Sequence, residues 1–222
     1  MPHWDSRPEP RWKDFQYKQP YAKGLGRVRE LLADPARDFD PATFWQWGTM
    51  QAMALITVLK DCEARFGEAG QQLVHEALRK TGLDVGRQIL ADISLPADLT
   101  EAEFASFYAT VINRIAYASL EDARIDDGGK VTFDILFCPH QDHYKAFDCR
   151  VQRYFVQGMI EAAQEIGGVR GWEVRFDTTI PSGAETCHFT VWKPSSEERD
   201  KWNQLTGLIE AEALSRARRR QP

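Results

Sequence analysis

Cysteine and histidine side chains gather in the second half of the sequence, and these residue types are the ones best able to do chemistry. They are Cys138, His140, His143, Cys149, Cys187 and His188. A thiolate beside an imidazole is the usual arrangement of a nucleophilic cysteine. The positive field at the start of a helix also stabilises a thiolate. The cluster is therefore a candidate site for a reactive cysteine.

Two other interpretations of these residues stay open. A cysteine at the end of a strand is commonly a small buried hydrophobe, and a histidine in a first helical turn is often only solvated. The side chains are also of types that bind zinc, but their spacing contains no C-x2-C pair and no H-x3-H pair. Cys187 and His188 are adjacent on a predicted strand, so they point to opposite faces. We predict no metal and no cofactor.

The composition limits the class of protein. The chain has 222 residues, with 28 Lys and Arg against 33 Asp and Glu, which gives a formal net charge of −5. This mild acidity argues against a nucleic-acid partner, because such proteins present a basic face. The most apolar stretch, 50–59, is about half a membrane span, and the first residues show no apolar signal-peptide core. We expect a cytoplasmic protein with reduced cysteines and no membrane partner.

Residues 1–42 differ in composition from the rest of the chain. They carry six of the eleven prolines and the aromatic residues Trp4, Trp12, Phe15, Tyr17, Tyr21 and Phe39. Proline prevents a long helix, while aromatic residues argue against simple disorder. We predict an extended N-terminal arm that packs on the body or on a partner subunit, with a short helix near 23–32.

Residues 43–222 are predicted to form one α+β domain that begins with helices. Apolar residues recur at helical spacing over about 44–66 and 68–90. A third helix, over about 100–118, opens with the capping box formed by Thr100 and Glu103. On this pattern His75 lies on an exposed helix face, and we assign it no function.

The second half of this domain is predicted to follow the order strand, helix, hairpin, helix around a small antiparallel sheet. The predicted elements are a strand over 131–138, a helix over 140–166 stopped by Gly167-Gly168, a hairpin of strands 172–177 and 186–192, and a helix from 195. This map places Cys138 at a strand end and both His140 and His143 at the start of the following helix. Cys149 would lie two to three turns into that helix.

Short motifs in the chain resemble the L-2-amino-thiazoline-4-carboxylic acid hydrolase family. The motifs are the segment 77–86, Phe137-Cys138-Pro139, Cys149 and Gly183-x-x-x-Cys187-x-Phe189. The likeness covers about residues 44–193. More loosely, the C-terminal half is similar to 4-vinyl-reductase and TRAPP-type ligand-binding domains. Those domains place helices against an antiparallel sheet around an apolar pocket, and they are commonly dimeric.

The resemblance implies hydrolytic opening of a small heterocycle at an amidine-like C–N bond, with Cys138, Cys149 and Cys187 at the family's cysteine positions. Such a reaction needs a nucleophile and a proton donor for the leaving atom. We expect Cys149 or Cys138 as the nucleophile and His140 or His143 as the acid and base.

Other side chains complete the hypothetical site. Asp148 would orient a histidine, and Arg150 or Arg153 would bind a carboxylate of the small-molecule substrate. His188 is a further candidate for substrate binding. Trp47 belongs to an aromatic stripe that suits either the core or the wall of an apolar ligand pocket.

The alternative function is a non-catalytic module that binds a small molecule or mediates dimerisation on the same scaffold, since fold does not determine function. This alternative predicts buried, unreactive cysteines around an apolar pocket. The hydrolase hypothesis predicts a reactive thiol in a pocket between a sheet and a helix. A metal-dependent hydrolase or lyase is a third interpretation. We also expect a homodimer, because the arm and the terminal helix have little surface of their own chain to cover.

Overall fold

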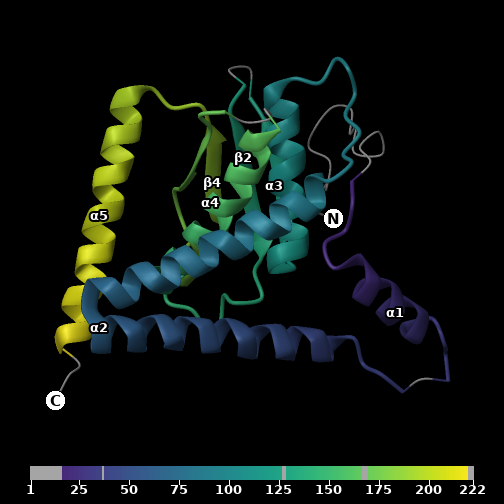
Figure 1. Ribbon diagram of the computed structural model, residues 1–222, viewed down its shortest axis with the longest axis horizontal. Helices are drawn as coiled ribbons and strands as arrows, with labels where there is room; N and C mark the ends of the chain where they lie inside the picture. The colour runs from purple at the N-terminus through teal and green to yellow at the C-terminus, as the bar shows by residue number, and fades with distance from the viewer. Residues whose placement is uncertain (1–16, 37, 127–128, 167–169, 220–222) are drawn as a thin grey trace.

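The structure is a computed structural model that describes residues 17–36, 38–126, 129–166 and 170–219 (Figure 1). The helices are α1 (Ala22–Leu32), α2 (Ala42–Leu90), α3 (Glu101–Tyr117), α4 (Arg150–Glu165) and α5 (Ser196–Arg219). The strands are β1 (Leu120–Ile125), β2 (Val131–Phe137), β3 (Glu173–Phe176) and β4 (Cys187–Trp192). The predicted α+β class is confirmed. Among these helices, none is both long and apolar enough to cross a membrane.

Helix α2 consists of two helical halves that meet at Gly67. This residue has φ 61° and ψ −139°, a conformation that glycine adopts without the clash of a Cβ atom. From this kink the two halves of α2 extend in the same general direction and form a V. One end of α5 lies next to the kink (Figure 1). Ile56 and Leu59 of the first half pack with Val74 of the second. The two helices predicted on either side of Gly67 are thus confirmed.

The second half of α2 crosses α4 at very short range. A Cβ atom added to Gly82 would lie 2.0 Å from the carbonyl oxygen of Phe155, and one added to Gly158 would lie 2.0 Å from that of Arg79. The two backbones can approach this closely only because neither glycine carries a side chain. This crossing fixes α4 against the body.

The sheet has the order β1-β2-β4-β3, with every neighbouring pair antiparallel. The predicted hairpin of β3 and β4 is confirmed. Strand β1 was not predicted, because its sequence, Leu-Glu-Asp-Ala-Arg-Ile, does not alternate between apolar and polar residues. It forms by pairing with β2, and its buried Glu121 accepts a hydrogen bond from Nε of Arg114 at 3.0 Å.

The predicted helix over 140–166 begins ten residues later than expected, at Arg150. Residues 138–145 form a loop of tight turns, in which the N–H of Gln141 bonds to the carbonyl of Cys138 at 3.0 Å. A single 3₁₀ turn, Ala146–Cys149, follows. His140 and His143 therefore lie in a loop, and Cys149 lies directly before α4. The predicted stop at Gly167-Gly168 lies outside the described residues.

Residues 17–21 of the N-terminal arm contact the body, whereas α1 has no buried residue. The ring of Tyr17 meets that of Phe107 edge-on at 5.5 Å between centroids. The N–H of Lys18 donates to the carbonyl of Ile89 at 3.3 Å. Helix α1 confirms the short helix predicted near 23–32. Trp4, Trp12 and Phe15 of the arm lie outside the described residues.

Candidate functional site

A cavity of about 110 Å³ lies between the sheet and the helices α3 and α4. One face of each helix lines it, since residues three or four apart share a face. Its helical wall comprises Ala105, Tyr108, Ala109, Ile112, Asn113 and Tyr117 of α3, and Gln152, Val156 and Ile160 of α4. Its sheet wall comprises Ile135, Val174, Phe176, Cys187, Phe189 and Val191.

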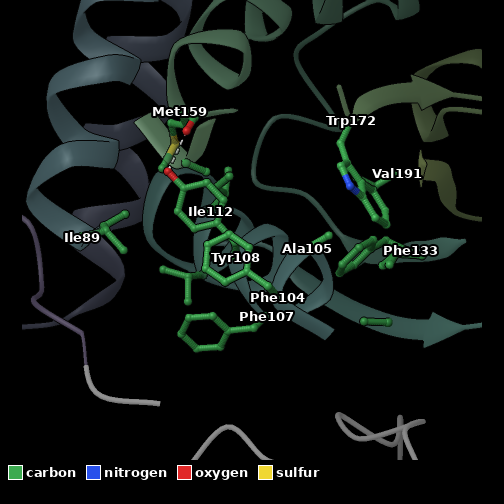
Figure 2. Packing of buried hydrophobic residues seen from close by; sticks show 14 of the residues in the cluster. Ile89, Phe104, Ala105, Phe107, Tyr108, Ile112, Phe133, Met159, Trp172 and Val191 are labelled. Atoms are coloured by element: carbon green, nitrogen blue, oxygen red, sulfur yellow. Dashed lines mark hydrogen bonds between the residues drawn. The ribbon is translucent and has the colours of Figure 1, made fainter. Parts of the chain in front are cut away.

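One end of the cavity is apolar. Ala105, near the start of α3, lies there with Trp172 and Val191, and Figure 2 shows these side chains in the core packing around Phe133. Further along α3 the hydroxyl of Tyr108 donates to the carbonyl of Met159 at 2.8 Å (Figure 2). Because that hydroxyl is already bonded, Tyr108 offers the cavity mainly its ring.

The other end brings three of the predicted cysteines together. Cys138 follows β2, Cys149 precedes α4 and Cys187 starts β4, and all three line the cavity. Burial raises the pKa of each thiol, that of Cys149 to about 12. The thiols of Cys138 and Cys187 also raise the pKa of Cys149, which places the three sulfur atoms near one another. At neutral pH the three side chains are therefore protonated thiols.

Only one of the two loop histidines reaches this cavity. His140 lines the wall, with its ring stacked on that of Tyr144 at 5.1 Å between centroids. Burial, and then the neighbouring His143, lower the pKa of His140, so its imidazole is neutral at pH 7. His143 is exposed and lies beside the ring of Trp45 instead.

The acidic and basic residues predicted for the site have partners elsewhere. The carboxylate of Asp148 pairs with Nζ of Lys60 at 2.7 Å and accepts the N–H of Lys145 at 3.2 Å. These partners, rather than a histidine, hold it in place. Arg153 bonds to Thr206 and does not line the cavity.

Arg150 is the centre of a buried ion network between α2, α4 and α5. Its side chain is only 5% exposed and lies 2.8 Å from Glu63 and 3.2 Å from Glu210. Since both acids neutralise the guanidinium and neither faces the cavity, Arg150 is not placed to hold a substrate carboxylate there.

Two further predicted residues lie apart from the cavity. His188 is on the opposite face of β4 from Cys187, as the strand geometry predicts, and its Nδ1 lies 3.0 Å from a carboxylate oxygen of Asp134. Trp47 is 60% exposed on the first half of α2 and is not part of the wall.

His75 was expected on an exposed helix face, and that expectation is wrong. The residue is 8% exposed because α5 covers this side of α2, and its ring stacks on Tyr154 at 3.6 Å. Nε2 lies 3.6 Å from Glu210, too far for a hydrogen bond. Burial, followed by the positive charge of Arg150, outweighs this carboxylate and lowers the pKa of His75 to about 4.

Several polar residues of the wall were not predicted from the sequence. Asn113 and Tyr117 lie one turn apart on α3, and Gln141 and Gln152 lie opposite them on the loop and α4. The sequence did contain a signal for Asn113, because this polar residue interrupts the apolar stripe of a helix that is otherwise buried on that face. Within the described residues, no group of three or more His, Cys, Asp or Glu side chains is arranged to hold a metal ion.

Comparison with known proteins identifies one family relationship. The chain is 50% identical over 218 residues to a protein of Archaeoglobus fulgidus described as "Uncharacterized protein", and the alignment covers 96% of each chain. This chain belongs to the same family as that archaeal protein. No family model matches the sequence.

A solved structure with partial likeness is a trafficking protein particle complex subunit 3 from Naegleria fowleri, covalently bound to palmitic acid. Its TM-score is 0.41 at 12% identity, over 67% of this chain and 95% of that one. A likeness of this size assigns neither a fold family nor a ligand to this chain.

Proposed function

We propose that this member of the archaeal protein's family binds a small apolar molecule in the cavity between α3, α4 and the sheet. One observation carries the proposal: among the described residues, no Asp, Glu, Lys or Arg side chain lines the wall. Ligand pockets combine such apolar walls with a few polar groups. The cavity volume of about 110 Å³ is comparable with the roughly 150 Å³ of an apolar cavity known to accept benzene.

The state of the cysteines supports binding over thiol chemistry. A nucleophilic cysteine needs a lowered pKa, whereas burial raises the pKa of Cys138, Cys149 and Cys187. Three protonated thiols contribute polarisable, weakly polar surface to a ligand site. The wall is then suited to hold an apolar molecule without reacting with it.

A hydrolase of the 2-amino-thiazoline-carboxylate type is the second candidate. The observation in its favour is that Cys138, Cys149, Cys187 and His140 line the same cavity. In this case neutral His140 would accept a thiol proton, and the thiolate would add to the C=N carbon while the π electrons move to the nitrogen, which takes the proton from His140. The ring C–N bond would then break as the second amidine nitrogen re-forms a C=N bond and its proton passes to the leaving nitrogen. Water would finally release the opened product and regenerate the thiol. Rapid reaction of one of these thiols near neutral pH would favour this candidate.

We also propose that the protein is a cytoplasmic homodimer. All four cysteines are free thiols, and three of them line the cavity, so oxidation would alter the wall. A reducing compartment preserves them. Apolar side chains along the first half of α2 are exposed and offer a face to a second copy of the chain.

Filling the cavity tests the proposed function directly. In Ala109→Phe a ring occupies the space beside α3, whereas Ala211→Phe places the same ring on the exposed side of α5. We expect benzene and ethylbenzene to bind the wild type and to raise its Tm. Ala109→Phe should lose at least about tenfold in affinity, a loss of roughly 1.4 kcal/mol, and Ala211→Phe should retain binding. If calorimetry detects no binding of either hydrocarbon to the wild type, the proposal is wrong.

A further inference from the structure

Three residues of the cavity wall each carry a buried polar atom that has no hydrogen-bond partner among the described residues. The atoms are Nδ2 of Asn113, Oη of Tyr117 and Nδ1 of His140. Leaving a buried polar group unpaired costs about 1–3 kcal/mol. Native proteins therefore keep few such groups, and each one requires an explanation such as a ligand.

These residues belong to the same end of the cavity. Asn113 and Tyr117 are four residues apart and share a face of α3. The thiol of Cys138 and the hydroxyl of Tyr144 both lie near enough to Tyr117 to raise its pKa. His140 stacks on the ring of the same Tyr144. The opposite end, at Ala105, Trp172 and Val191, is apolar.

The chemistry of the three groups defines what they would recognise. Nδ2 of Asn113, which is only 5% exposed, can only donate a hydrogen bond, and the hydroxyl of Tyr117 can also donate. The matching group on a ligand is thus an acceptor. A carboxylate would be buried with no cationic partner, because no Lys or Arg lines the described wall, and an unpaired buried charge is very unfavourable.

We propose that the ligand of this cavity carries one uncharged acceptor oxygen of the carbonyl type, held by Asn113 and Tyr117, with its apolar body directed toward Trp172. His140 lies beside this oxygen and completes the polar end with its neutral ring. The inference rests on the proposed function, because it requires that the cavity binds an apolar molecule.

Three ligands of similar size separate the possibilities: acetophenone carries the acceptor, ethylbenzene lacks it, and benzoate replaces it with a charge. We expect calorimetry to show acetophenone binding about threefold to tenfold tighter than ethylbenzene, the effect of one net hydrogen bond. Benzoate should bind more weakly than either at pH 7.

Two conservative variants test whether Asn113 and Tyr117 cause the preference for acetophenone over ethylbenzene. Asn113→Leu keeps the approximate size and removes the donor, and Tyr117→Phe removes only the hydroxyl. Each should lower the preference for acetophenone at least about twofold while leaving ethylbenzene affinity unchanged. Because each change also removes an unpaired buried group, the free variants should unfold at a Tm equal to or above that of the wild type. Tyr21→Phe, at a side chain 65% exposed and outside the wall, removes the same kind of hydroxyl and is the control that should change neither affinity.

The outcomes distinguish the two proposals. Equal affinity for acetophenone and ethylbenzene would overturn this inference and leave the proposed function standing. Tightest binding of benzoate would also overturn it, because the polar end would then favour an anion. Failure of ethylbenzene, like that of benzene, to bind would overturn the proposed function, and this inference with it.

Discussion

Cys149 lies directly before the first turn of α4, where the helix field favours a thiolate, and yet its thiol is hard to ionise. Burial raises its pKa from 9.0 to about 12, which corresponds to about 4 kcal/mol against ionisation. A helix terminus contributes about 1 kcal/mol in the opposite direction. The loss of solvation therefore decides the state of this side chain.

Thiol reactivity follows from this balance. At pH 7 we expect Cys149 to react with iodoacetamide at least about a hundredfold more slowly than free cysteine, because so little thiolate is present. Cys138 and Cys187, whose pKa values are also raised, should react more slowly than free cysteine as well. Peptide mass spectrometry after timed alkylation measures each site separately. The same protein unfolded in urea is the control and should react at the rate of free cysteine. Fast modification of any of the three at pH 6–7 would instead support the hydrolase.

His75 should make stability depend on pH. Its folded pKa, about 4, is below the ordinary value of 6.5, so the unfolded chain binds more protons between these values. The free energy of unfolding is therefore not reduced by His75 above pH 6.5. As the pH falls from 6.5 toward 4, this free energy decreases by at most about 3 kcal/mol, because the unfolded chain then takes up a proton that the buried ring does not. Urea unfolding from pH 4 to 7 should show this slope, and His75→Gln should remove it.

The comparison between variants matters because other groups titrate in the same range. Burial raises the pKa of Glu121 to about 7. The contribution of Glu121 to the free energy of unfolding is therefore present at low pH and is lost as the pH rises through 7, which is opposite to the effect of His75. His143→Gln, at an exposed position, is the comparison variant; because His143 lowers the pKa of His140, this variant should change the slope, but less than His75→Gln. An unchanged slope in His75→Gln would contradict the role assigned to His75.

At the scale of elements, the crossing of α2 and α4 is the contact that shapes the cavity. Gly82 and Gly158 let the backbones approach, and Gly86 adds a third close contact, with Ala162 and the hydroxyl of Tyr108. This packing holds α4 in place, and α4 in turn presents Gln152 and Val156 to the cavity. The glycines thus act on the cavity through the position of a helix.

Gly158→Ala tests this crossing. A methyl group there would lie 2.0 Å from a carbonyl oxygen, and because backbone atoms cannot easily move aside, we expect a loss of at least about 2 kcal/mol in the free energy of unfolding. Gly207→Ala is the matched control, since nothing lies within 4 Å of the added atom in α5. Its higher helix propensity should stabilise the protein by up to about 1 kcal/mol. Equal denaturant midpoints for both variants would show that the crossing of α2 and α4 does not require glycine at position 158.

At the scale of the whole molecule, the first half of α2 lies along one edge of the protein (Figure 1), and many of its apolar side chains are exposed. Its exposed side chains are Phe44, Trp45, Trp47, Met50, Met53, Val58 and Phe66. Soluble proteins rarely expose apolar patches of this kind except at interaction sites. Of these side chains, Phe44, Trp47, Met50, Met53 and Val58 fall within one half of the helix circumference. Such a surface suits the two-fold contact that dominates among homodimers.

We expect light scattering at micromolar concentration to give twice the chain mass of 25.4 kDa. Met50→Lys, at a side chain 60% exposed, should yield the monomer, because a charge would be buried without a partner. Leu208→Lys, at a position 62% exposed on α5, is the control that should remain dimeric. A wild-type mass of 25.4 kDa would exclude the dimer under these conditions.

Sequence periodicity was most informative where one face of an element is buried. The capping box at Thr100 and the kink glycine Gly67 marked helix ends correctly, because their effects are local. The start of α4 was placed ten residues too early, because turns within residues 138–145 compete with the helix. Strand β1 was missed because its pairing with β2, rather than its own pattern, forms it.

By itself the sequence determined the α+β class, the helices around Gly67, the hairpin of β3 and β4, and the opposite directions of Cys187 and His188. These features depend on residues within a few positions of one another. Only the tertiary structure decided that three cysteines and His140 share one cavity, that Arg150 is paired away from it, and that Asn113 and Tyr117 line it. Burial and the partners of charged groups are set by segments distant in sequence, and they decide which side chains can ionise, bond or bind.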